Sequence, residues 1–172
     1  WVQLGSTIRG TSPCLYTGTS VAISGDGQRI IVASNYNAGL AAICDDLVGG
    51  DTGHATVYDF VDNEWVQVGA RIDGDASIVS MSRDGSTISV TLNFTVTNIY
   101  QLQGDAWELS GQIEAEIREF MTRGAAFNAD GTQVAVAGKR SANGAAYVQI
   151  SEDLGQTIAS VVTDEDECCS WY

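Results

Sequence analysis

One motif recurs three times in this sequence and constrains its fold more than any other feature. Its copies are SVAISGDGQRIIVAS (20–34), SIVSMSRDGSTISVT (77–91) and GAAFNADGTQVAVAG (124–138). Each copy has apolar residues before an Asp-Gly pair and alternating apolar residues after it. Asp-Gly between two such runs is a strong hairpin signal, because a type I′ turn needs a positive φ at both central residues. The sequence therefore predicts three β-hairpins, the first of which turns at Asp26-Gly27.

A second motif alternates with the first and begins with tryptophan. Its copies are WVQLG (1–5), WVQVG (65–69) and WELSG (107–111). The segments before the second and third copies match each other, as ATVYDF (55–60) and TNIYQL (97–102). A third such segment, AAYVQI (145–150), is followed by QTIASVV, which has no Trp. The repeated unit is therefore four short strands, two around Asp-Gly and two around a second turn.

Four short strands in a unit of about 40–50 residues are typical of a β-propeller blade. We therefore predict an all-β, β-propeller-like fold with about three four-stranded antiparallel blades, at 20–68, 77–110 and 124–162. A β-sandwich with a meander is the alternative, because short strands with regular turns fit it too. Residues 1–162 form the predicted repeat domain, and 163–172 (TDEDECCSWY) form an acidic, cysteine-containing tail.

Three blades are too few for a closed ring, since propellers typically have at least four. They leave two apolar sides open, and an orphan strand at Trp1–Leu4 precedes them. Either the chain belongs to a longer propeller, or it pairs with other copies through Trp1–Leu4, or its third unit caps the fold. The Glu- and Arg-rich middle of the link QIEAEIREFMTRG (112–124) is expected to form one or two helical turns.

The charge balance excludes some classes of partner. Twenty-two acidic residues against eight basic ones give a formal net charge of −14. Such a surface repels phosphate, which argues against nucleic acid and anionic membranes. No run of about 20 apolar residues is present, so we expect no membrane insertion. The segment WVQLGSTIRG has no leader pattern and no initial Met, so the chain resembles a mature or processed segment.

Four cysteines, Cys14, Cys44, Cys168 and Cys169, form no metal-binding pattern. There is no CxxC, and the single histidine, His54, follows Cys44 by ten residues, so a zinc site is not expected. An even count in an acidic β-rich chain favours disulfides and an oxidising compartment. Four cysteines allow three pairings, which the sequence leaves open. Adjacent Cys168 and Cys169 are the first candidates for a link to another chain or to the tail.

The first unit resembles a known kind of repeat. SVAISGDGQRIIVAS, GHATVYDF and WVQVGARIDGD (within 20–75) resemble tandem repeats of large secreted proteins from algae and other stramenopiles. Those repeats are similar to the FG-GAP propeller blades of integrin-α-type proteins. The resemblance implies a propeller in a secreted, extracellular or cell-surface setting and implies no catalytic activity. FG-GAP blades often carry a DxDxDG calcium loop, which this sequence lacks, so the resemblance does not imply calcium.

The sequon at Asn93 is consistent with glycosylation and secretion.

The first unit also has an insertion at 35–53, NYNAGLAAICDDLVGGDTG, that the other units lack. Asp45, Asp46 and Asp51 in it are hard oxygen ligands beside glycines, the kind of loop that calcium prefers. Their spacing matches no known calcium loop, so the alternative is a plain acidic surface loop. We expect no cofactor other than this candidate calcium.

No catalytic constellation is present: the sequence has no Ser-His-Asp, Cys-His, P-loop or GxGxxG arrangement. We therefore expect a non-enzymatic extracellular module for structure or adhesion. It would assemble with other copies or with the rest of a longer propeller, or bind protein or glycan. The alternatives are a hydrolase or lyase with acids around a propeller channel, and a calcium-binding receptor fragment. Trp1, Trp65 and Trp107 are expected at sheet edges or seams, with a glycan-stacking ladder as the alternative.

Overall fold

The computed structural model describes the chain except for residues 13, 37–51, 115–119, 141–145, 152–157 and 163–172. In the described part every regular element is a β-strand, and every strand pairing is antiparallel. The prediction of an all-β fold is therefore confirmed. Since the described residues form no helix, none of them is in a helix long and apolar enough to cross a membrane.

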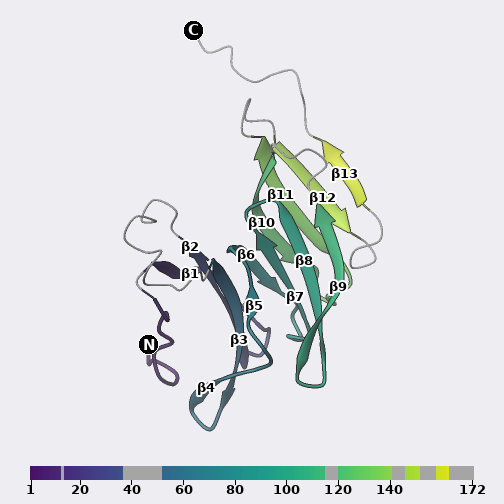
Figure 1. Ribbon diagram of the computed structural model, residues 1–172. Helices are drawn as coiled ribbons and strands as arrows, with labels where there is room; N and C mark the ends of the chain where they lie inside the picture. Colours follow the sequence, from purple (N-terminus) through teal and green to yellow (C-terminus); the bar gives the residue numbers. More distant parts are fainter. Residues whose placement is uncertain (13, 37–51, 115–119, 141–145, 152–157, 163–172) are drawn as a thin grey trace.

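The strands form three sheets, and in each sheet the spatial order of the strands follows the chain (Figure 1). The first sheet contains β1 (Leu15–Ile23), β2 (Arg29–Tyr36), β3 (Gly53–Val61) and β4 (Glu64–Gln67), with the short β5 (Ile72–Asp73) also paired to β3. The second contains β6 (Ala76–Met81), β7 (Thr87–Leu92), β8 (Val96–Gln103) and β9 (Ala106–Glu114). The third contains β10 (Phe120–Phe127), β11 (Val134–Arg140), β12 (Ala146–Ser151) and β13 (Ile158–Val162).

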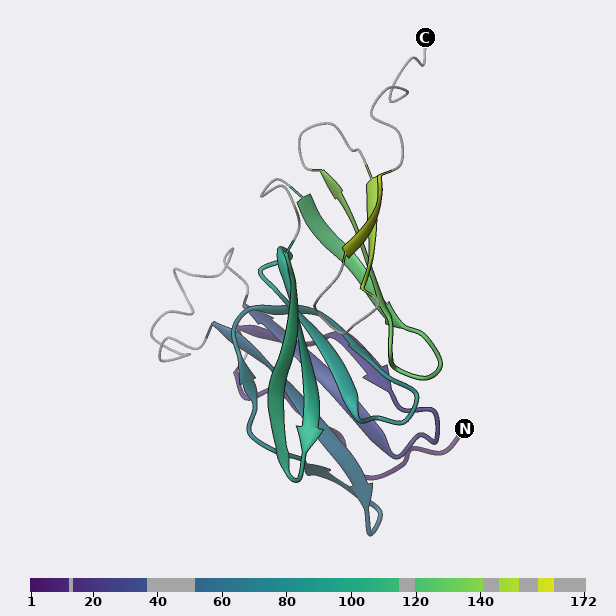
Figure 2. The same ribbon diagram turned by 90° about the vertical axis from the view of Figure 1, so that its right-hand side faces the viewer.

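The sheets follow one another in space as they do in sequence, and the second lies between the other two (Figures 1 and 2). Their first strands are neighbours, because β6 packs against both β1 and β10. Within the described residues the three sheets do not close into a barrel or a ring. Each sheet corresponds to one predicted four-strand unit and extends beyond the predicted bounds at one or both ends.

One local prediction is wrong, and another falls outside the described residues. The helical turns were expected in the middle of the link 112–124, where 115–119 lie outside the described residues. The described ends of the link are strand: 112–114 belong to β9 and 120–124 to β10. The backbone of 112–114 pairs with β8, and this pairing holds it extended. Trp1–Leu4 was expected to be a strand, but it has no sheet partner among the described residues and is irregular.

The Asp-Gly hairpins also differ from the type I′ turn that the sequence suggested. Of the two residues of the first Asp-Gly turn, only Gly27 has a positive φ, 74°, and its backbone N–H donates to the Ser24 carbonyl at 3.0 Å. Asp26 has a negative φ because its carboxylate accepts from the Ser24 hydroxyl (2.6 Å) and the Gln28 amide (3.0 Å). The side chain thus organises the turn, as in an Asx-turn. The Asp62-Asn63 turn instead has positive φ at both residues, 51° and 66°.

Two seams of apolar side chains hold the sheets together. The seam between the first and second sheets is the larger, and its buried members are Ile31, Ala33, Ala55, Val57, Ala76, Val79, Met81, Ile88 and Val90. The seam between the second and third sheets contains Ile99, Ile113, Val134 and Val136. Burying each of the larger side chains contributes roughly 1.5–3 kcal/mol, so these seams are the main source of stability.

Arg29 on β2 adds a polar link across the first seam. Its guanidinium makes two hydrogen bonds to the Asp59 carboxylate on β3, at 2.6 and 2.8 Å. Its third nitrogen donates to the Gly85 carbonyl in the second sheet at 2.9 Å. The guanidinium also lies 5.8 Å from the ring centre of Trp107. One side chain therefore joins two strands of the first sheet to the turn and the outer strand of the second.

Replacing a large side chain at the centre of the first seam should destabilise the fold strongly. Ile88 is fully buried, so we expect Ile88→Ala to lower the free energy of unfolding by about 2–5 kcal/mol. Val66→Ala is the control, because half of the Val66 side chain is exposed, and it should change the value by less than about 0.5 kcal/mol. Urea unfolding monitored by tryptophan fluorescence measures both, and equal losses would contradict the proposed seam.

Candidate functional site

The register of the first two strands is the same in all three sheets, so equivalent positions can be compared directly. We define the backward face of a sheet by four such positions on its first two strands. They are Val21, Ile23, Ile30 and Val32 in the first sheet, Val79, Met81, Ile88 and Val90 in the second, and Ala125, Phe127, Val134 and Val136 in the third. The backward faces of the second and third sheets pack against the sheet before them. The first sheet has no such neighbour among the described residues.

Equivalent side chains of the backward faces differ in their exposed fraction between the first and second sheets. Val79 and Met81 are 5% and 8% exposed, whereas their equivalents Val21 and Ile23 are 64% and 60% exposed. Ile30 on the same face is partly buried. Val32, the fourth position, is only 8% exposed, so the water-exposed part of the backward face of the first sheet lies on β1. The positions equivalent to Val21 and Ile23 are buried in the second sheet and partly buried in the third.

The opposite, forward face also repeats, and we define it by four positions on the second and third strands. They are Ile31, Ala33, Ala55 and Val57 in the first sheet, Ser89, Thr91, Thr97 and Ile99 in the second, and Ala135, Ala137, Val148 and Ile150 in the third. All eight positions of the first and second sheets are buried, but the four in the third are only partly buried. Both ends of the stack therefore present incompletely covered apolar side chains.

The tryptophan motif makes a repeated contact between consecutive units. The indole Nε1 of Trp107 donates to the Val68 carbonyl at 3.2 Å, and that of Trp65 donates to the Leu4 carbonyl at 3.1 Å. Val68 and Leu4 are the fourth residues of WVQVG and WVQLG, so the two bonds are equivalent. Trp65 and Trp107 thus lie at contacts between units, one of the two positions expected from the sequence, while Trp1 is fully exposed.

The glycine that ends each motif repeats the correspondence. Gly5 and Gly69 have nearly equal positive φ values, 67° and 72°. A Cβ at Gly5 would lie 3.1 Å from Trp65 Cδ1, and a Cβ at Gly69 would lie 3.0 Å from Trp107 Cδ1. Trp1–Gly5 is therefore placed against the first sheet as 65–69 is placed against the second. It occupies the position of an outer strand belonging to a sheet before the first.

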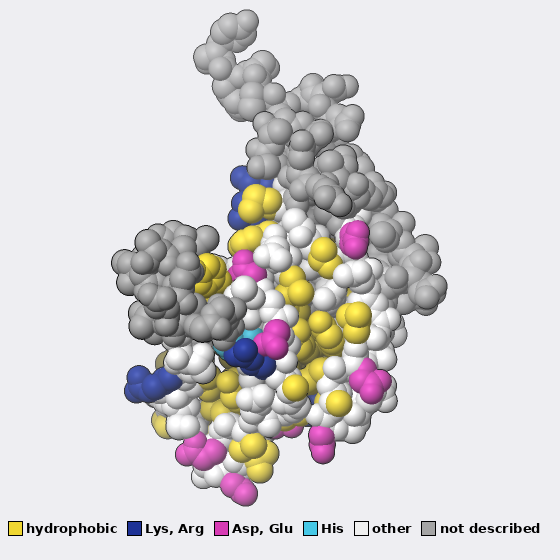
Figure 3. Space-filling model, in the orientation of Figure 1, with side chains coloured by type: hydrophobic (Ala, Val, Ile, Leu, Met, Phe, Trp, Pro, Cys, Tyr) yellow, Lys and Arg dark blue, Asp and Glu magenta, His cyan; other side chains and the backbone are white. Residues whose placement is uncertain are grey.

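Acidic side chains are spread over the surface visible in Figure 3, and lysine and arginine side chains are few there. Apolar side chains are also visible among them. Nine large apolar side chains of the described residues are exposed, and five of them, Trp1, Val2, Leu4, Val21 and Ile23, belong to Trp1–Leu4 or to the backward face of β1. Exposed apolar side chains thus occur on a chain that is acidic as a whole.

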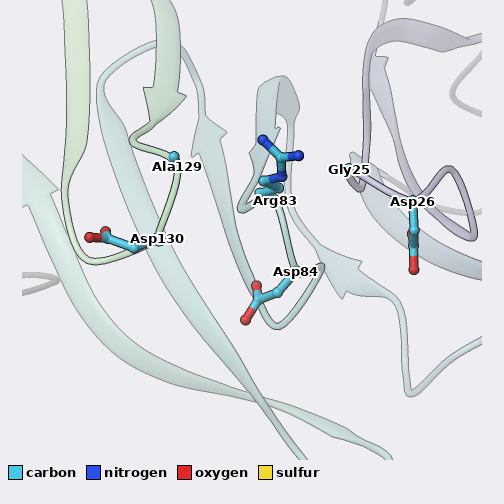
Figure 4. Close-up of a pocket in the computed structure, with 6 residues that line it drawn as sticks. All are labelled: Gly25, Asp26, Arg83, Asp84, Ala129 and Asp130. Carbon is cyan, nitrogen blue, oxygen red and sulfur yellow. The ribbon is translucent and has the colours of Figure 1, made fainter.

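The three Asp-Gly turns come together at one end of the stack. Asp26, Asp84 and Asp130 line one open hollow of about 560 Å³ together with Arg83. Figure 4 shows each aspartate at the tip of its own turn, with Arg83 extending away from the carboxylate of Asp84. The turns are in contact, since the Gly25 amide donates to the Arg83 carbonyl at 2.7 Å. The repeat thus gathers three acids that are far apart in sequence.

Each of these carboxylates is held by its own turn. The Ser24 hydroxyl and then the Gln28 amide lower the pKa of Asp26. The Ser82 hydroxyl and Ser86 amide do the same for the pKa of Asp84, as the Thr132 hydroxyl and amide do for that of Asp130. A general acid needs a carboxyl with a raised pKa, so these three pKa shifts run opposite to what general-acid catalysis needs. Their hydrogen bonds instead fix the hairpin turns.

Most residues singled out for metal binding or disulfides fall outside the described residues. These are Asp45, Asp46 and Asp51 of the candidate calcium loop, and Cys44, Cys168 and Cys169. Within the described part no group of three or more His, Cys, Asp or Glu side chains is arranged to hold a metal ion. Cys14 is buried at the start of β1 and is not a free thiol. The pairing of the cysteines stays a prediction.

Two further residues from the sequence are described. Asn93 is exposed in the turn between β7 and β8, where its backbone N–H donates to the backbone carbonyl of Asp75 at 3.0 Å. Its glycosylation stays a prediction. His54 is the second residue of β3 and is 7% exposed. The sequence predicted two open apolar sides but did not name the residues of the backward face of the first sheet, although apolar residues on both sides of β1 and β2 were the signal.

Comparison with known proteins gives no further assignment: no family profile matches the sequence, and no curated protein is significantly similar to it.

Protonating the turn aspartates should weaken the fold in acid. Folding lowers the pKa of Asp26, Asp84 and Asp130 from about 3.8, so their stabilisation is complete above that value. This stabilisation is lost as the pH falls below 3.8 and through the lower pKa values that the three carboxyls have in the folded chain. We therefore expect the urea midpoint of the wild type to fall more steeply between about pH 5 and about pH 2 than that of a variant with all three changed to Asn.

The matched control changes the net charge equally at three other acids, as Asp105→Asn, Glu108→Gln and Glu114→Gln. Below pH 3.8 this control should keep the steep pH dependence of the wild type. If both triple variants show the same slope, the turn carboxylates do not carry the stabilisation.

Removing the indole N–H from one contact between units should cost one hydrogen bond. Trp107→Phe keeps an aromatic ring near Arg29 but leaves the Val68 carbonyl without its donor. We expect a loss of about 0.5–1.5 kcal/mol in the free energy of unfolding. Trp1→Phe in dilute protein is the control and should have no measurable effect, because Trp1 is fully exposed. A Trp107→Phe variant as stable as the wild type would refute the contact.

Proposed function

We propose that this chain is a non-enzymatic structural module of β-propeller type, which works by packing the backward face of its first sheet against a further blade. One observation carries the proposal. Val21 and Ile23 are mostly exposed, at positions that pack against a neighbouring sheet in the second and third sheets, fully buried in the second and partly buried in the third. Leaving such side chains in water forgoes roughly 1.5–3 kcal/mol each, so the face gains stability from being covered.

The arrangement of the sheets supports the propeller interpretation over a sandwich. Each sheet is a four-strand meander, whereas sandwiches of the immunoglobulin kind have Greek-key connections. The first strands lie next to one another and their turns gather at one end, as strands do around a propeller axis. The equivalent contacts of Trp65 and Trp107 repeat the step from one unit to the next.

The described residues favour assembly over the other candidate functions. The three gathered aspartates have lowered pKa values, which suits turn stabilisation and not acid catalysis. Trp65 and Trp107 are partly buried with their indole N–H groups bonded, which makes them poor members of a glycan-stacking ladder. A secreted or cell-surface setting remains part of the proposal, supported by the engaged thiol of Cys14 and the exposed Asn93.

Charges placed on the backward face should prevent assembly. We expect the wild-type chain to self-associate as its concentration rises through the micromolar range, because the apolar face then finds a partner. Val21→Asp with Ile23→Asp should weaken association by about 100-fold, equivalent to about 2.7 kcal/mol. Sedimentation velocity over a dilution series measures the association.

The control carries the same two charges at other exposed apolar positions, as Val66→Asp with Leu109→Asp. It should associate like the wild type. A wild-type chain that stays monomeric at all concentrations, or equal weakening in both double variants, would contradict the proposed function.

A further inference from the structure

The two open ends of the stack are complementary in chemistry. One end is the backward face of the first sheet, and the other is the forward face of the third sheet. All eight side chains at these ends are apolar: Val21, Ile23, Ile30 and Val32 at one, and Ala135, Ala137, Val148 and Ile150 at the other. The forward face of the second sheet instead includes Ser89, Thr91 and Thr97. The ends thus resemble the wholly apolar seam between the first and second sheets.

Trp1–Gly5 marks where the covering sheet must lie. It holds the position of an outer strand, because the Leu4 carbonyl accepts from Trp65 as the Val68 carbonyl accepts from Trp107. Val2 and Leu4 are largely exposed, and no described strand pairs with this segment. A sheet that packed on the backward face would bring its third strand alongside Trp1–Gly5, as β3 lies alongside β4.

From these observations we propose that two copies of the chain join head to tail into a closed ring of six sheets. The third sheet of each copy would pack its forward face on the backward face of the other's first sheet. This inference rests on the proposed propeller-type assembly. It adds that the partner is a second copy of the chain, that the copies pack head to tail, and that two copies close the ring. Head-to-tail contacts close when the rotation per unit permits, and six blades lie within the range of known propellers.

The ring requires an exchange of outer strands. Trp1–Gly5 would reach the edge of the partner's third sheet, where β13 pairs with β12 in the single chain. Only one strand can hold that edge. The sequence around β13, QTIASVV, lacks the Trp and the closing Gly of the motif, whereas WVQLG has both. Trp1–Gly5 therefore displaces β13, and each copy supplies one outer strand to the other.

A complementation experiment tests both partner and orientation in the full chain. The backward-face variant is Val21→Asp with Ile23→Asp, and the forward-face variant is Ala135→Asp with Ala137→Asp. Each variant alone should be monomeric in native mass measurement, whereas the wild type should give a dimer of about twice 18.2 kDa. An equimolar mixture of the two variants should recover a dimer, because one intact face of each kind remains.

The outcomes separate this inference from the proposed function. If the forward-face variant dimerises by itself, like faces pair, so the head-to-tail ring is wrong while assembly through the backward face stands. Wild-type species that grow beyond two copies would likewise overturn the closed ring alone. A wild type that is monomeric at all concentrations overturns both. Urea unfolding of each variant at low concentration confirms that it is folded, and Val66→Asp with Leu109→Asp should remain dimeric.

A second variant tests the exchanged strand. Deleting residues 1–5 removes the proposed outer strand and leaves all four residues of each open face unchanged. We expect the deletion to weaken dimerisation at least tenfold while the dilute chain stays folded. Dimers as tight as those of the wild type would overturn the strand exchange.

Discussion

Sheets that are apolar on both faces impose the main constraint on this molecule. Successive side chains of a strand point to opposite faces, so a sheet with one wet face alternates apolar and polar residues. Residues 21–23 and 30–33 are instead apolar without interruption. A sheet of this kind must be covered twice, and stacking it against its own repeats is the economical solution. A stack that does not close into a ring leaves two end faces, and this is why the single chain exposes Val21 and Ile23.

Polar contacts fix how one sheet follows the next. Apolar seams are not directional, so burial alone would permit several ways of stacking. Arg29 limits these ways, because it bonds Asp59 in its own sheet and the Gly85 carbonyl in the next. The bond from the Gly25 amide to the Arg83 carbonyl joins the turns of the same two sheets. The apolar seam thus supplies stability, and the turns set the geometry of the step.

The repeat allowed much of the fold to be predicted, and its limits explain the errors. The Asp-Gly pairs located all three first hairpins because only glycine adopts the positive φ of that turn at little cost. The type of turn was wrong, because the Asp26 carboxylate bonds the turn's own hydroxyl and amide and so favours a negative φ. The second unit was predicted to end at residue 110, but β9 continues to Glu114 because pairing with β8 holds 112–114 extended.

The candidate site could not be read from single motifs, because it depends on which positions are equivalent. Val21 and Val79 look alike in sequence, and the strand register shows that they hold equivalent positions. The structure then shows that Val21 is exposed whereas Val79 is buried. Burial depends on neighbours in space, and a hairpin motif says nothing about what lies beyond its sheet. The Trp65 and Trp107 contacts could be predicted from the sequence, since the repeated motif that begins with Trp indicated sheet edges or seams for both residues.

The contact surfaces differ in polarity: one of the two seams within the chain is wholly apolar and the other contains hydroxyls, whereas both end faces are apolar. The seam between the second and third sheets tolerates buried hydroxyls, such as the Thr91–Thr97 hydrogen bond of 2.8 Å. Neighbouring sheets of one chain are held together covalently, so a weak seam still forms at high effective concentration. Separate molecules must overcome several kcal/mol of lost translational and rotational freedom on association. A seam between copies therefore needs more apolar surface, and the two end faces have it, with apolar side chains at all eight positions.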